Sequence, residues 1–140
     1  NLFLISSSGR GFKTNLKNFS SNRKNGKQLL KLNNEEYAKI CFHEEGDMFA
    51  IIGENKKLLV MPVNDIPILK KGRGVILQKY RNSCFSDATT FNKNEGIFWI
   101  NKNGRKRIEK NYEFWIGRRG SSGKIYRQKL SNPPKFKLLI

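Results

Sequence analysis

The fold is decided by three similar apolar stretches, Leu2-Phe3-Leu4-Ile5, Phe49-Ala50-Ile51-Ile52 and Ile97-Phe98-Trp99-Ile100. Each stretch is short and rich in branched and aromatic side chains, which is typical of a β-strand. Counted from Phe3, Phe49 and Phe98, the stretches recur after 46 and 49 residues. Repeats of about 40–50 residues with roughly four strands each are typical of propeller blades.

The repeat continues beyond the first strand of each unit. Gly9, Asn55 and Gly104 follow at matched positions, and these residue types tolerate positive φ in a hairpin turn. A cation follows each turn, and a cluster of cations with glycine comes later in each unit, at 22–27, 70–74 and 117–124. A second apolar run follows each cluster, and further strands are expected at 37–42 and 85–91.

The sequence therefore predicts an all-β fold with about three propeller-like blades of about four strands each. The expected limits of the repeats are 1–47, 48–96 and 97–130, with a tail at 131–140, and the whole chain 1–140 is expected to form one region. Because known propellers have at least about four blades, we expect a partial toroid that belongs to a longer protein.

The charge of the chain predicts a polyanionic partner. The sequence contains 28 lysines and arginines against 11 acidic residues, a net charge of +17. So large a charge favours nucleic acid over the alternatives, which are an acidic protein, an anionic membrane surface or a compositional bias without function. No apolar run has the length of a membrane-spanning helix, so membrane association is expected to be absent or at most peripheral.

The cations at the turns and in the clusters should share one rim, because equivalent positions of a radial repeat lie on the same side of the disc. The acidic residues fall mostly late in each unit and should lie elsewhere. An arc of cations suits a bent phosphate backbone. The candidate DNA-binding residues are Arg10, Lys13, Arg23, Lys24, Lys27, Lys56, Lys57, Lys70, Lys71, Arg73, Arg105, Lys106, Arg107, Arg118, Arg119 and Lys124.

The sequence predicts no catalytic site, metal site or cofactor in this chain. The cluster at 117–124 fails as a phosphate-binding loop, because Ile125 stands where a magnesium-binding hydroxyl is needed. Cys41 and Cys84 have no metal-ligand spacing and are expected to be small core residues, and the single histidine, His43, lacks an activated nucleophile beside it. A small hydrolase is therefore disfavoured.

Several motifs resemble those of a known family. The stretches at 9–12, 23–28, 52–60 and 72–78 are similar to the C-terminal β-pinwheel of the bacterial DNA topoisomerase IV A subunit. The related gyrase A subunit has a seven-residue box, Gln-Arg-Arg-Gly-Gly-Lys-Gly, and here Arg23, Gly26 and Lys27 match it while Asn22, Asn25 and Gln28 depart from it. The departures favour the topoisomerase IV subunit over the gyrase subunit.

The resemblance implies a non-catalytic module that binds and bends duplex DNA without sequence preference. It would steer DNA for relaxation and decatenation by an ATP-dependent type II topoisomerase, whose cleaving tyrosine lies outside this chain. The implied partners are the topoisomerase B subunit, double-stranded DNA and the rest of the A subunit, in the cytoplasm at the nucleoid. The alternatives are a gyrase-type wrapping domain and a protein-interaction propeller whose charge is incidental.

Overall fold

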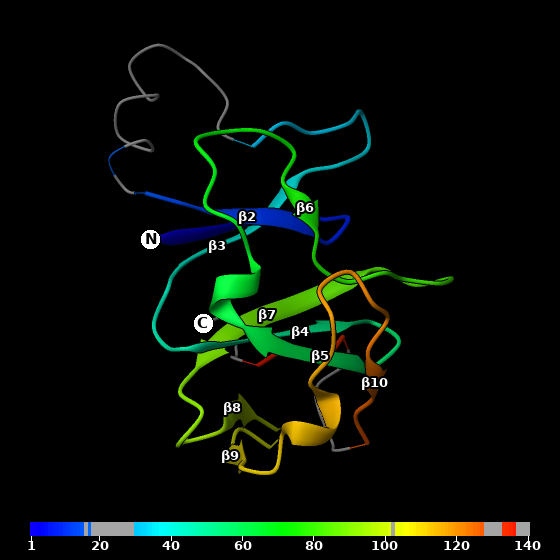
Figure 1. Ribbon diagram of the computed structural model, residues 1–140. Helices are drawn as coiled ribbons and strands as arrows, with labels where there is room; N and C mark the ends of the chain where they lie inside the picture. The colour runs from blue at the N-terminus through cyan, green and yellow to red at the C-terminus, as the bar shows by residue number, and fades with distance from the viewer. Residues whose placement is uncertain (16, 18–29, 102, 128–132, 137–140) are drawn as a thin grey trace.

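The computed structural model describes residues 1–15, 17, 30–101, 103–127 and 133–136. It confirms the all-β prediction, with antiparallel sheets stacked in the order of the three units (Figure 1). The first sheet has the strand order β3-β1-β2-β6, and the second has the order β10-β5-β4-β7. The third unit contributes a two-stranded sheet, β8 with β9.

The three apolar stretches and the expected strands at 37–42 and 85–91 are all strands in the structure. The first sheet contains β1 (Leu2–Ser6), β2 (Arg10–Thr14), β3 (Ala38–His43) and β6 (Val75–Ile76). The second contains β4 (Met48–Gly53), β5 (Lys57–Pro62), β7 (Phe85–Phe91) and β10 (Lys124–Ile125). The third contains β8 (Ile97–Ile100) and β9 (Lys106–Glu109), and two short 3-10 helices, η1 (Val63–Asp65) and η2 (Glu113–Trp115), lie between strands.

Each four-stranded sheet takes its last strand from the following unit. β6 belongs to the second unit but pairs with β2 of the first, and β10 belongs to the third unit but pairs with β5 of the second. We call β6 and β10 the donor strands. Because each donor strand links two units through backbone hydrogen bonds, neighbouring blades are joined by a sheet as well as by a core.

The strand register corrects the predicted spacing of the repeat. Ile5 pairs with Gly11, Ile52 with Leu58 and Ile100 with Lys106, which places equivalent residues 47 and 48 positions apart. Positive φ is found at Gly9 (81°), Lys56 (64°) and Gly104 (79°). The prediction was right for the two glycines and wrong for Asn55, because the middle hairpin begins one residue later. Asn55 instead accepts a hydrogen bond from the Lys57 amide through its side-chain oxygen, at 3.1 Å.

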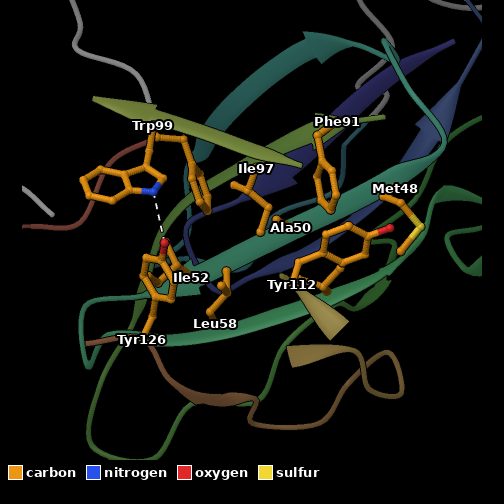
Figure 2. Packing of buried hydrophobic residues seen from close by; sticks show 11 residues of the cluster. Met48, Ala50, Ile52, Leu58, Phe91, Ile97, Trp99, Tyr112 and Tyr126 are labelled. Atoms are coloured by element: carbon orange, nitrogen blue, oxygen red, sulfur yellow. Dashed lines mark hydrogen bonds between the residues drawn. The ribbon is translucent and has the colours of Figure 1, made fainter. Parts of the chain in front are cut away.

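Strand β4 shows how the blades pack, because alternate side chains point to opposite faces of a sheet. Phe49 and Ile51 join the core shared with the first sheet, whereas Ala50 and Ile52 face the third unit. Figure 2 shows this second core, in which the indole Nε1 of Trp99 donates to the hydroxyl of Tyr126 at 3.0 Å. Burying one such large side chain stabilises the fold by about 1.5–3 kcal/mol.

The two cysteines depart from their predicted place in the core. Cys41 and Cys84 are both free and exposed. Cys41 lies on β3, the last strand at its side of the first sheet, and Cys84 lies in the loop that leads into β7. Beside Cys41, Phe42 packs against the core instead, since adjacent strand residues face opposite sides, and Phe85, the first residue of β7, is buried beside Cys84.

Candidate nucleic-acid interface

The cation-glycine clusters of the second and third units lie along the edge formed by the donor strands. We call residues 70–79 and 117–127 the donor edge. The Lys79 amide donates to the Ser121 carbonyl at 3.0 Å, and the Gly120 amide donates to the Leu77 carbonyl at 2.9 Å. The first unit joins in the same way, because the Lys31 amide donates to the Gly72 carbonyl at 2.7 Å. The edge is therefore continuous across the three units.

Two glycines allow the donor strands to approach their partners. Gly74 has a φ of +78° and Gly123 a φ of +79°. A Cβ at Gly74 would lie 2.4 Å from the Gly11 carbonyl oxygen, and one at Gly123 would lie 2.5 Å from that of Leu58. Both the left-handed backbone and the close approach therefore require glycine, which gives the glycines of these clusters a structural role.

The cations at the hairpin exits begin the strands next to the donor edge. Arg10 and Lys57 are the matched first residues of β2 and β5, and Arg105 precedes β9 at the matched position. Arg10 is partly buried, and its Nη2 donates to the Gly74 carbonyl at 3.2 Å, which fastens β2 to the donor segment. Lys56 and Arg105 are exposed.

The cations within the clusters differ in how firmly they are held. Lys70, Lys71 and Arg118 are exposed. Arg119 is also exposed, and its Nη1 donates to the Asp65 carbonyl at 3.0 Å. Such a contact with a neutral carbonyl positions the guanidinium without cancelling its charge.

Arg73 is the cation of the cluster that carries a full counter-ion. Its Nη2 lies 2.6 Å from Oε1 of Glu36. Glu36 also accepts hydrogen bonds from the hydroxyls of Ser8 and Ser6 and from the Asn33 amide. These hydrogen bonds lower the pKa of Glu36 to about 2, and the bond from Ser8 has the largest effect on it. Arg73 is therefore neutralised locally and contributes less to a phosphate-binding surface than its neighbours.

The cations of the third unit include two that cover aromatic rings. Lys106 Nζ lies 4.5 Å from the ring centre of Phe98, and Lys124 Nζ lies 4.4 Å from that of Phe114. Arg107 is exposed beside Lys106 on β9. At exposed sites a cation over a ring gains about 0.5–1 kcal/mol and remains charged, so these lysines stay available to a polyanion.

One predicted residue does not present its charge. Lys13 is only 3% exposed, and its Nζ lies 3.5 Å from Oε1 of Glu44, so it serves the interior of the first unit and not the interface. Three further predicted residues, Arg23, Lys24 and Lys27, lie outside the described part of the chain, as does the whole gyrase-like box at 22–28.

Acidic residues gather at the other ends of the strands. Glu44, Glu45 and Asp47 lie between the end of β3 and the start of β4, and Glu95 lies between β7 and β8. The hairpin turns that precede β2, β5 and β9 are at the opposite ends of these strands. We call 44–47 and 92–95 the acidic loops. Glu54 lies instead in the β4–β5 hairpin turn, and Glu36 bonds to Ser8 of the first hairpin, so the acidic residues gather at these strand ends without being confined to them.

Sequence reasoning missed two exposed cations, Lys31 and Lys79. Both follow the second apolar run of their unit, and their amides make matched hydrogen bonds to the cluster of the next unit. Lys79 lines a shallow depression together with Arg10, Arg119, Gly74, Val75, Ile76 and Gly120. The signal was a lysine within two residues of the end of a short apolar run in two successive units.

Within the described ranges, no three histidine, cysteine, aspartate or glutamate side chains come together as a metal-binding group. A search of the same residues for a helix long and apolar enough to cross a membrane finds none.

Comparison with protein families decides the family. The family described as "DNA gyrase C-terminal domain, beta-propeller" matches residues 1–38 and 47–83, more than half of the chain. The chain belongs to this family. The matched residues include β1, β2, β4, β5 and the donor strand β6, whereas β3 lies almost entirely in the gap between the two matched ranges.

Relatives of this gyrase C-terminal-domain chain carry the name of one enzyme subunit. The A subunit of DNA topoisomerase 4 from Rickettsia conorii is 42% identical over 124 residues, which cover 89% of this chain and 17% of that protein. The subunit of the same name from Caulobacter vibrioides is 37% identical over 134 residues, covering 96% of this chain and 18% of that protein. The chain thus spans about a sixth of the length of these relatives.

Solved structures of the family share the fold. The Escherichia coli ParC C-terminal domain superposes with a TM-score of 0.72 at 19% identity, over 90% of this chain and 55% of that chain. The gyrase A C-terminal domain superposes with a TM-score of 0.64 at 18% identity, over 87% of this chain and 41% of that chain. At these identities the likeness shows the β-pinwheel fold alone.

Proposed function

We propose that this chain is a non-catalytic, sequence-independent binding module for duplex DNA. The observation that carries the proposal is the continuous donor edge, which joins the clusters at 70–74 and 117–124 and carries exposed cations from both units. Three acidic residues, Glu44, Glu45 and Asp47, lie at the strand ends opposite the hairpins that carry Arg10 and Lys57, so we expect the positive field of the +17 chain to extend along the donor edge. Phosphates are the ligand that such an edge attracts.

The interface we propose consists of the predicted cations whose positions suit it. They are Arg10, Lys56, Lys57, Lys70, Lys71, Arg105, Lys106, Arg107, Arg118, Arg119 and Lys124, with Arg73 as a partly neutralised member. We propose that a duplex that follows the edge across the three units bends, as DNA does on other architectural proteins. The region 1–140, with repeats at 1–47, 48–96 and 97–130, would act as a unit in this role.

The wider role follows from the named relatives. We propose that the full protein is the A subunit of an ATP-dependent type II topoisomerase, that it works with a B subunit in the cytoplasm at the nucleoid, and that this module steers DNA for relaxation and decatenation. Strand cleavage would belong to the part of the protein outside this chain. No cofactor is assigned to the module.

Binding to a linear duplex of random sequence at several salt concentrations tests the proposal. For Lys70→Glu combined with Lys71→Glu, we expect weaker binding and a log–log salt slope reduced by about 0.9 for each lost phosphate contact. The matched control is Lys93→Glu combined with Lys110→Glu, two exposed lysines away from the donor edge, and it should bind nearly as well as the wild type. Salt-independent binding, or tighter binding to an acidic protein, would favour the protein-interaction alternative.

A further inference from the structure

The shallow depression on the donor edge combines groups from all three units. Arg10 comes from the first unit, Lys79 from the second and Arg119 from the third, and Ile76 lies among them. We call this depression the junction notch. Its three cations come together only when the units are docked, because β6 must pair with β2 and residue 121 must accept the Lys79 amide.

Backbone contacts fix the walls of the notch. Arg10 Nη2 is held at the Gly74 carbonyl, and Arg119 Nη1 is held at the Asp65 carbonyl. Gly120, on the third wall, is held at the Leu77 carbonyl and has a φ of +87°. Lys79 is exposed at the rim. A site with two positioned guanidiniums and one ammonium is suited to a single phosphate group.

An exposed isoleucine in the notch is unexpected for a surface that binds its ligand by charge alone. Ile76 is 45% exposed, and Ile125, its register equivalent on the other donor strand, is 51% exposed. A single exposed apolar residue needs no explanation. Here, however, two exposed isoleucines occupy matched positions on the donor strands, and both lie among cations. A ligand that satisfies both must be anionic with an apolar surface next to the charge. The sugar-phosphate backbone of a nucleic acid has both.

We infer that the junction notch holds one sugar-phosphate unit of the bound duplex, with the phosphate on Arg10, Lys79 and Arg119 and the deoxyribose on Ile76. This inference rests on the proposed function and names the contact at one point of the interface. It makes Lys79 and Ile76 DNA-contacting residues of two kinds, one electrostatic and one apolar.

The two kinds of contact have different signatures in a binding titration. For Lys79→Gln we expect about threefold to tenfold weaker binding to a random linear duplex and a salt slope smaller by about 0.9, because one phosphate contact is lost. For Ile76→Ser we expect a similar loss of affinity at every salt concentration with an unchanged slope, since no ion is released by an apolar contact. Both side chains are exposed, so we expect both variants to fold, and circular dichroism and thermal unfolding are the checks.

The controls are Ile68→Ser, an isoleucine that is 59% exposed outside the notch, and Lys93→Gln, an exposed lysine away from the donor edge. Both should bind within twofold of the wild type. Inorganic polyphosphate, which has no sugar, is the second probe, and Ile76→Ser should bind it as the wild type does while Lys79→Gln binds it less well.

The outcomes separate the inference from the proposed function. If the wild type binds duplex DNA with a steep salt slope but Lys79→Gln and Ile76→Ser behave as their controls do, the notch is not a contact and only this inference fails. If Ile76→Ser weakens polyphosphate and DNA equally, the sugar contact is refuted. If the wild type shows no salt-dependent DNA binding, the proposed function itself fails.

Discussion

The two junctions between blades have the same backbone and different side chains. At the first junction, β2 with β6, the Leu77 amide donates to the Gly9 carbonyl at 3.0 Å, and at the second, β5 with β10, the Tyr126 amide donates to the Lys56 carbonyl at 2.8 Å. The glycines Gly74 and Gly123 have nearly the same φ.

The side chains at the two junctions differ although the backbone hydrogen bonds and the glycine conformations are the same. Val75 and Leu77 of the first junction are replaced by Lys124 and Tyr126 at the second. The comparison teaches that glycine and backbone pairing set the geometry of the donor edge. Side chains at the same positions are then free to carry charge or to fill the neighbouring core.

The largest expected effect comes from the shared glycines. Gly74→Ala and Gly123→Ala each place a Cβ against a partner carbonyl oxygen in a left-handed backbone, so we expect each to lower the free energy of unfolding by about 3 kcal/mol. Urea denaturation measures it. Gly104→Ala is the matched control, because its φ is +79° but an added Cβ meets nothing within 4 Å, and the strain alone costs about 1 kcal/mol. Equal losses at Gly74 and Gly104 would show that the close approach does not matter.

A smaller effect distinguishes the second junction from the first. Tyr126 is buried, and burial raises the pKa of its hydroxyl, which accepts from Trp99 Nε1. Tyr126→Phe leaves the indole N–H without its acceptor, and we expect a loss of about 1.5 kcal/mol in the free energy of unfolding. Tyr37→Phe, at a side chain 58% exposed, should change it by less than about 0.5 kcal/mol. If the two variants are equally stable, the hydrogen bond in Figure 2 adds nothing to the fold.

The smallest effect concerns the ion pair that is particular to the first junction. Because hydrogen bonding lowers the pKa of Glu36 from 4.5 to about 2, its contribution to stability is present above about pH 4.5 and is lost as the pH falls toward 2. Glu36→Gln should therefore be less stable than the wild type at neutral pH and less dependent on pH in that window. Thermal unfolding between pH 2 and 6 measures this. The control is Glu35→Gln, at an exposed glutamate. If both variants lose stability in the same way between pH 6 and pH 2, the role given to Glu36 is contradicted.

Strand positions could be predicted from the sequence because the central strands are short, continuous apolar runs rich in branched and aromatic residues. The runs at Leu2, Phe49 and Ile97 became β1, β4 and β8, and the predicted third strands became β3 and β7. The exact register could not be predicted. The middle hairpin takes its left-handed residue at Lys56, and a lysine in that conformation gives no signal in the sequence.

The sequence predicted which positions carry the cations of the candidate site. It did not predict which of these cations are free to bind a phosphate. The recurring clusters indicated a shared edge, which the donor strands form. Donor pairing between units is a long-range contact, so the sequence could not indicate that Lys79 would lie beside Arg10 and Arg119. Nor could it indicate that Lys13 and Arg73 would each have a glutamate partner, since Glu44 and Glu36 are about 30 or more residues away along the chain.

Hydrogen exchange of the chain with and without a random linear duplex tests the central claim most directly. The account predicts that DNA protects amides along the donor edge, at 70–79 and 117–127, and leaves the acidic loops at 44–47 and 92–95 unchanged. Protection that gathers at the acidic loops, or that spreads equally over both regions, would contradict a duplex bound along the donor strands.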